Sequence, residues 1–336
     1  MQNITSFNIK SFNTNAQNEA RLALREASYN GADFGVEYSD LRLDNTGAIV
    51  DNKYASVRKD NGQILGIHSK SYKPLTHKQM IDNQREIIIR SGLADGSIKE
   101  TISLDKTGKK CYVKHELPNH YLYTPDGDVA RLRFLSTNSF NGSWAYIVSA
   151  GAKQDACQNG QIFLNDVATL YKSRHNIHLN LDHAADVMTK AVPIFMEQSK
   201  LWHRWHGTKC NNYKALNIFA DVVQKPEITN ALYKYMGNHE AEGNHGIIEY
   251  VDGIHFTEHE HIKGNRNFIH LWDRWNTHYR NALGQNLWGV YNTLTDWATH
   301  VSKSNAPTYS ASIQHTRENK VQKVLNKDHW GFKIAV

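Results

Sequence analysis

The chain has 336 residues, of which 40% are hydrophobic and 21% charged, a balance that is typical of a folded globular protein and excludes a largely disordered one. The formal net charge of +6 favours polyanionic partners but is small for this length, so a nucleic-acid surface must be a local patch. The three cysteines are widely spaced, the start lacks an apolar signal core, and no apolar run approaches about 18 residues, which together predict a cytoplasmic protein without a membrane span.

The first segment, residues 1–45, is rich in Asn, Ser and Thr. This composition predicts a polar N-terminal arm rather than part of the core, with one short helix around Glu19–Ala27. An arm of this kind is either disordered or packs on a neighbouring subunit.

Residues 46–180 have the pattern of an antiparallel sheet made of hairpins. In the first hairpin, Asn61-Gly62 lies between the extended segments Tyr54–Lys59 and Gln63–His68, and Asn-Gly in this position is the strongest short-range hairpin signal. Two further hairpins are predicted, one joining Thr101–Leu104 to Cys111–His115 and the other joining Ala130–Leu135 to Ser143–Ser149.

A helix is predicted between the first two hairpins. Thr76 and Gln79 have the spacing of a capping box, apolar residues then recur on one face, and Gly92 provides a stop. Because all the connections are short, the strands are expected to form one antiparallel sheet with helices on one face.

Residues 181–336 are expected to be mainly helical, with an insertion at 237–266 that is dense in Gly, His, Asn and Glu. A helix from Leu181 to Trp205 should be kinked or split by Pro193. Two more are predicted over Asn267–Leu283 and from Leu287 to Val301. Their tryptophans recur at helical spacing, which favours core packing over base stacking. The predicted fold class is therefore α+β: an antiparallel hairpin sheet packed with helices, followed by a mainly helical C-terminal half.

A basic rim on the predicted hairpins is the first candidate site. Arg131 and Arg133 share one face of their strand because side chains at i and i+2 project together, and paired guanidiniums suit a phosphate backbone. The predicted nucleic-acid-binding residues are Arg58, Lys59, Lys70, Lys73, Lys109, Lys110, Arg131, Arg133, Lys153 and Arg174, with Tyr72 and Tyr146 as stacking platforms. The alternative is a solvated sheet face whose charges prevent aggregation.

Metal and catalytic signals are weak. His255, His259 and His261 lie in the His-rich insertion, where imidazoles could bind a transition metal. No spacing there matches a metal motif with a known mechanism, so a solvated loop is favoured. Cys157 has no evident His or Asp partner, and no nucleotide-binding fingerprint or nucleophile elbow occurs. We therefore expect no cofactor, and a non-enzymatic function is favoured.

Three segments carry a family resemblance: Leu65–Pro74 (LGIHSKSYKP), Leu135–Asn159 (LSTNSFNGSWAYIVSAGAKQDACQN) and Asn286–His300 (NLWGVYNTLTDWATH). They resemble a family of phage- and plasmid-like proteins of unknown function, whose members often carry an Arg-His pair where Arg174-His175 stands. The resemblance spans roughly residues 50–325 and implies a phage-borne protein in the cytoplasm of a host cell. The hairpins and their crossing helix are also similar to the layout of single-strand annealing recombinases, which is an analogy of fold alone.

These observations lead to one hypothesis and two alternatives. We predict a single-stranded DNA-binding protein that assembles as a homo-oligomer, a ring or filament, and promotes strand annealing and recombination without a nucleotide cofactor. One alternative is a metal-dependent hydrolase that uses the His-rich segment. The other is a non-catalytic protein that inhibits a host defence or regulates phage replication.

Overall fold

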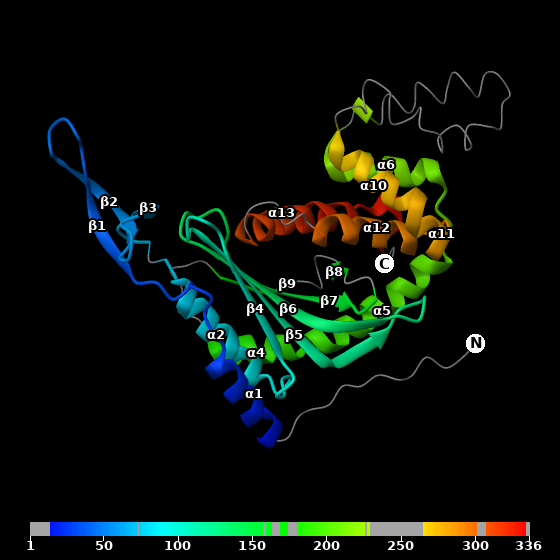
Figure 1. The fold of residues 1–336 in the computed structure, drawn as a ribbon, viewed down its shortest axis with the longest axis horizontal. Helices are drawn as coiled ribbons and strands as arrows, with labels where there is room; N and C mark the ends of the chain where they lie inside the picture. Colours follow the sequence, from blue (N-terminus) through cyan, green and yellow to red (C-terminus); the bar gives the residue numbers. More distant parts are fainter. Residues whose placement is uncertain are drawn as a thin grey trace.

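Two antiparallel sheets form the N-terminal half of the computed structural model, which describes residues 14–72, 74–156, 159–162, 169–173, 180–225, 227–228, 265–300 and 307–333 (Figure 1). The smaller sheet has the order β1-β2-β3, made of Val36–Arg42, Ile49–Arg58 and Ile64–Ser69. The larger has six strands in the order β4-β5-β6-β7-β8, with β9 also paired to β7. Its strands are Lys99–Leu104, Lys110–Tyr123, Val129–Ser139, Tyr146–Gln154, Gly160–Ile162 and Thr169–Ser173.

The C-terminal half is mainly helical, so the predicted α+β class is confirmed. Its helices are α4 (Leu181–Thr189), α5 (Ala191–Gly207), α6 (Asn212–Val223), α10 (Arg266–Arg274), a π-helical turn (Trp275–Tyr279), α11 (Arg280–Leu283), α12 (Leu287–Thr299), α13 (Pro307–Leu325) and a short 3-10 turn (Asp328–Trp330). Trp202, Trp205 and Trp275 are fully buried, which confirms their predicted role in the core. Within the described residues, no helix is both long and apolar enough to cross a bilayer.

The capping box predicted before α2 (His77–Arg90) is present. The Thr76 hydroxyl accepts a hydrogen bond from the backbone N–H of Gln79 at 3.1 Å, and the Gln79 side chain accepts one from the backbone N–H of Thr76 at 3.0 Å. These bonds satisfy two N–H groups that a helix start leaves without intrahelical partners. Gly92 follows with a φ of +70°, a conformation that costs glycine little and that ends the helix as predicted.

The predicted split at Pro193 is also confirmed. α4 ends at Thr189 and α5 begins at Ala191, so Pro193 lies in the first turn of α5. A proline ring clashes with the carbonyl four residues earlier, which here belongs to Thr189. The chain therefore begins a new helix instead of continuing the first one.

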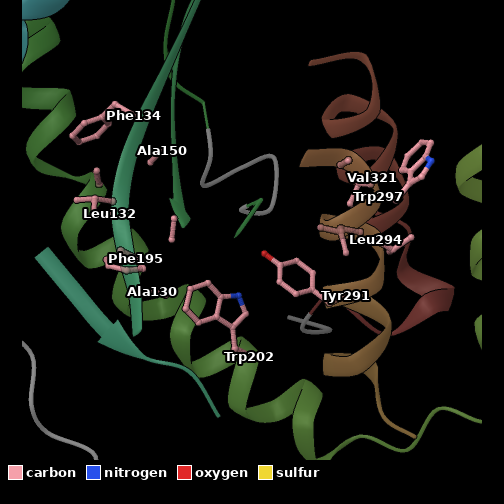
Figure 2. Packing of buried hydrophobic residues seen from close by; sticks show 14 of the residues in the cluster. Ala130, Leu132, Phe134, Ala150, Phe195, Trp202, Tyr291, Leu294, Trp297 and Val321 are labelled. Atoms are coloured by element: carbon pink, nitrogen blue, oxygen red, sulfur yellow. The ribbon is translucent and has the colours of Figure 1, made fainter. Parts of the chain in front are cut away.

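The two faces of the six-stranded sheet differ in chemistry. Alternate side chains of β6, including Leu132 and Phe134, are buried among apolar residues and lie beside Phe195 of α5 (Figure 2). The intervening side chains of β6, including Arg133, point to the other face, toward α13. We call the first the apolar face and the second the polar face. α2, α4 and α5 lie along the apolar face, and α12 and α13 lie over the polar face (Figure 1).

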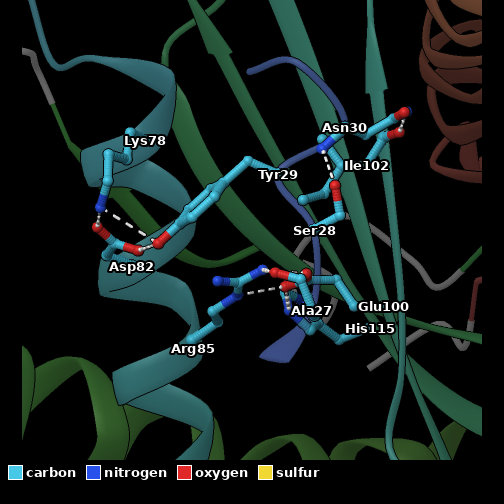
Figure 3. A network of polar contacts seen from close by, with 10 residues as sticks. All are labelled: Ala27, Ser28, Tyr29, Asn30, Lys78, Asp82, Arg85, Glu100, Ile102 and His115. Carbon is cyan, nitrogen blue, oxygen red and sulfur yellow. Dashed lines mark hydrogen bonds and ion pairs between the residues drawn. The ribbon is translucent and has the colours of Figure 1, made fainter. Parts of the chain in front are cut away.

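A buried ion-pair network joins α2 to the apolar face (Figure 3). Arg85 donates two hydrogen bonds to Glu100 of β4, at 2.6 and 3.0 Å, and His115 of β5 contacts the same carboxylate at 2.8 Å. Burial alone would raise the pKa of Glu100, but the hydrogen bonds from Arg85 and His115 outweigh it and lower the pKa to about 2. Arg85 also donates to the carbonyl of Ala27 at 3.1 Å, so the network anchors the segment that follows α1.

The N-terminal segment contributes more to the fold than its composition indicates. The predicted short helix is present as α1 (Thr14–Glu26), but its Ala20 and Leu24 are buried in the core. β1, which the sequence pattern did not predict, then pairs with β2. The small sheet β1–β3 projects away from the rest of the protein (Figure 1), and the part of the predicted arm from α1 to β1 therefore belongs to the folded structure.

Candidate nucleic-acid interface

Three hairpin turns from separate parts of the chain meet at one end of the six-stranded sheet. Arg58, at the β2–β3 turn, lies so close to the β4–β5 turn that a Cβ on Gly108 would be 2.7 Å from its Nη1. The backbone N–H of Phe140, before the β6–β7 turn, donates to the carbonyl of Lys109 at 2.8 Å. His77 ties the start of α2 to the same place, with its Nε2 2.9 Å from the Gly108 carbonyl.

Four lysines and a tryptophan gather at these turns. Lys59, Lys106 and Lys109 form no ion pair with any acid in the described part of the chain. The Nζ of Lys110 lies 4.9 Å from the centre of the Trp144 ring, which is half-buried and also contacts His315 in the middle of α13. We call Lys59, Lys106, Lys109, Lys110 and Trp144 the turn-end surface.

Arg58 belongs to the same region, but its charge is already compensated. Its guanidinium donates to both carboxylate oxygens of Asp60, at 2.9 and 2.6 Å, and stacks over Phe34 at 4.0 Å. The Arg58 side chain is only 14% exposed. We therefore assign Arg58 a role in holding the turns together rather than in binding.

The predicted cations Arg131, Arg133 and Lys153 lie elsewhere, on the polar face of the sheet. Arg131 and Arg133 do project together, as the strand periodicity requires, but α13 lies over this face. Arg131 makes a bidentate ion pair with Asp155, and Lys153 lies 3.2 Å from Glu116. These residues are thus separated from the turn-end surface, and each of the three lies beside an acid, Arg133 at 3.5 Å from Glu318.

The two predicted stacking residues differ in exposure. Tyr146 is buried, with its hydroxyl 3.4 Å from Gln84, so its ring faces the core and is out of reach of a base. Tyr72 is half-buried and stacks on His68 at a centroid distance of 4.8 Å. Lys70 is exposed at the end of β3.

The remaining predicted residues, namely Lys73, Arg174, His255, His259 and His261, lie outside the described residues. Among the residues that are described, no group of three or more His, Cys, Asp and Glu side chains could hold a metal ion. Cys111 and Cys210 are buried, and burial raises the pKa of both thiols, that of Cys210 to about 12. Neither thiol is suited to be a nucleophile at neutral pH.

A second group of charged side chains, which no sequence motif marks, lies between the polar face and α13. The Tyr112 hydroxyl donates to Glu318 at 3.0 Å, and the Lys114 ammonium donates to Gln314 at 3.0 Å. Burial, together with the neighbouring Arg133 and Lys153 charges, lowers the pKa of Lys114 to about 8. The only signal in the sequence was the alternation of Tyr112, Lys114 and Glu116 along β5, because the partners on α13 come about 200 residues later in the chain.

Comparison with known proteins identifies one family. No curated protein matches the chain, and no solved structure does. A family model described as a domain of unknown function, DUF932, matches residues 64–330. The match begins at the first residue of β3 and includes the whole six-stranded sheet and the helices that cover it. The chain belongs to the DUF932 family.

Proposed function

We propose that this protein binds single-stranded nucleic acid at the turn-end surface and promotes the annealing of complementary strands. The observation that carries the proposal is the convergence of three hairpin turns that bring together Lys59, Lys106, Lys109 and Lys110. Three of these lysines have no acidic partner within the described residues. Unpaired cations on a common surface suit a polyanion, because each ammonium can neutralise one phosphate and release its counterion.

The chemistry of the turn-end surface favours binding without sequence preference. Lysine is a point charge that contacts phosphates rather than base edges. Trp144, held between Lys110 and His315, offers an aromatic ring, and bases of every kind stack on aromatic rings. A strand held by its phosphates keeps its base edges free for pairing with a second strand.

Annealing needs no nucleotide cofactor in this scheme, because base pairing itself supplies the free energy. It does need many weak sites in a row, which a homo-oligomer provides. The projecting sheet β1–β3 supports such assembly, since Tyr38, Ile49, Ile64 and Ile67 are exposed there and exposed apolar side chains gathered on one element are typical of interaction surfaces. β1 and β3 are also the edge strands of this sheet, and edge strands can pair with another copy.

An annealing assay tests the proposal. Two complementary fluorescent oligonucleotides are mixed with the wild type or with a variant in which Lys59, Lys106, Lys109 and Lys110 are all changed to Gln. A matched control changes the exposed Lys99, Lys190, Lys200 and Lys323 to Gln. We expect faster annealing with the wild type and the control and no acceleration with the turn-end variant. Equal rates for the two variants would refute the assignment of this surface, and no acceleration by the wild type would refute annealing itself.

A further inference from the structure

Arg133 is a buried charge whose hydrogen bonds are incomplete. It is 3% exposed, and its Nε and Nη2 atoms have no hydrogen-bond partner within the described residues. The acid Glu318 lies 3.5 Å from Nη2. This distance is longer than the roughly 2.7–2.9 Å of a charge-assisted hydrogen bond. A buried guanidinium whose hydrogen bonds are not made is unfavourable unless an acceptor completes them.

Glu318 makes no hydrogen bond with Arg133, and both of its oxygens accept other hydrogen bonds. One accepts a hydrogen bond from the Tyr112 hydroxyl at 3.0 Å and the other accepts one from the Gln314 side chain at 2.8 Å. The Glu318 carboxylate therefore contacts β5 and α13 as well as Arg133. The Nε and Nη2 atoms of Arg133 thus have no acceptor among the described residues.

Other charged side chains lie near Arg133 on the polar face. Lys114 interacts electrostatically with the cations Arg133 and Lys153 and with the acids Glu116 and Glu318. The low pKa of Lys114, about 8, has burial as its first cause and the repulsion from Arg133 as its second.

The backbone beside Arg133 is shaped around the guanidinium. A Cβ on Gly160 would lie 2.5 Å from Nη2 and 2.7 Å from Nη1, so only glycine lets β8 approach this closely. Solvent reaches the edge of the cluster, because the side chains of Lys153 and Glu116 are 31% and 21% exposed.

We infer that Arg133 and Lys114 form a binding site for a phosphate group on the polar face of the sheet, separate from the turn-end surface. The Nε and Nη2 donors lie on one edge of the guanidinium and match two phosphate oxygens, and the Lys114 ammonium supplies a second cation. Two oxygens of one phosphate group can accept from both donors, and the charge of the group is attracted by both cations. The phosphate group belongs either to a free phosphate or nucleotide or to the end of a nucleic acid.

The site is tested first with inorganic phosphate and the full-length protein, without nucleic acid. Thermal unfolding is followed at constant ionic strength, with chloride replaced stepwise by phosphate. We expect phosphate to raise the Tm of the wild type by roughly 2 °C at about ten times its Kd. Arg133→Gln and Lys114→Gln should each weaken phosphate binding roughly tenfold or more. Arg131→Gln is the matched control, because Arg131 lies on the same strand and face but is paired with Asp155.

The outcomes separate this site from the proposed function. A wild type that does not respond to phosphate beyond chloride, or equal responses in all variants, would overturn the inference whatever the protein does with DNA. Should Arg133→Gln fail to fold, Lys114→Gln decides the question by the same measurement. Oligonucleotides of one sequence, with a 5′-phosphate or a 5′-hydroxyl, then identify the source. Tighter binding of the phosphorylated strand in the wild type and not in Lys114→Gln assigns the site to a nucleic-acid end, and equal binding of both strands assigns it to free phosphate or a mononucleotide.

Discussion

The two faces of the six-stranded sheet are made by the same strands and have opposite chemistry. On the apolar face, Leu132 and Phe134 are fully buried. The helices that cover this face are α2, which precedes the sheet in the chain, and α4 and α5, which follow it. On the polar face, Arg133 is equally buried but contacts Glu318 and lies beside a second cation, Lys114. The difference teaches that burial alone does not define the apolar core of this protein, since one buried face consists of apolar side chains and the other holds a buried Arg133 whose Nε and Nη2 have no hydrogen-bond partner among the described residues.

The largest loss of stability is expected on the apolar face. Phe134→Ala removes a fully buried ring and should lower the free energy of unfolding by about 4 kcal/mol through lost burial and the cavity left behind. Chemical denaturation measures this loss. Leu135→Ala, at the half-buried neighbour on the other face, is the matched control and should cost less. An equal loss at both positions would show that the two faces do not differ in packing.

The second-largest loss of stability is expected in the ion-pair network on the apolar face. Glu100→Gln leaves Arg85, whose side chain is 8% exposed, without its counter-charge and should cost about 3 kcal/mol. The folded-state pKa of Glu100 is lowered from 4.5 to about 2, so its contribution is present above pH 4.5 and is lost as the pH falls toward 2. Denaturation curves between these values should show a loss of stability in the wild type that is smaller in Glu100→Gln. A parallel loss in both proteins would contradict the network's role.

A smaller effect is expected at the start of α2. Thr76→Ala removes the hydroxyl that caps the helix and should lower stability by about 1 kcal/mol. Thr76→Ser keeps an oxygen in the same place and serves as the control. If both variants lose the same free energy, the capping bond is not what Thr76 contributes.

The smallest effect is expected at the exposed edge of the polar face. Asp155→Asn breaks the ion pair with Arg131. The Arg131 side chain is 33% exposed and that of Asp155 is 42% exposed, so the change should alter the free energy of unfolding by less than about 1 kcal/mol. Thermal unfolding at low salt measures it. A loss as large as that of Glu100→Gln would mean that the polar face is as important to folding as the apolar one.

Much of the fold could be predicted because its signals are local. The Asn61-Gly62 turn, the capping box at Thr76 and the break before Pro193 each depend on neighbouring residues, and all three are present. α13 gave no comparable signal. Its Gln314 and Glu318 are buried against Tyr112, Lys114 and Arg133. Among its described side chains, the buried apolar residues Val321, Val324 and Leu325 come only in its last turns, so no apolar stripe runs along the whole helix.

The candidate sites were harder to predict than the fold. The lysines of the second hairpin and Arg133 could be chosen from charge and strand alternation. Their environments could not, because partners such as Asp60, Glu318 and Gly160 are set by how distant strands and helices meet. Trp144 was likewise unremarked as a platform, since only the folded structure places it between Lys110 and His315.

The salt dependence of single-stranded DNA binding tests the central claim most directly. The dissociation constant of a labelled oligonucleotide is measured over a range of salt for the wild type, the turn-end variant and its lysine control. Each lysine that neutralises a phosphate contributes roughly 0.7 to the slope of log affinity against log salt, so removing four should make the slope shallower by about 2.8. We predict this change for the turn-end variant and none for the control. Identical slopes in all three proteins would contradict the assignment of nucleic-acid binding to the turn-end surface.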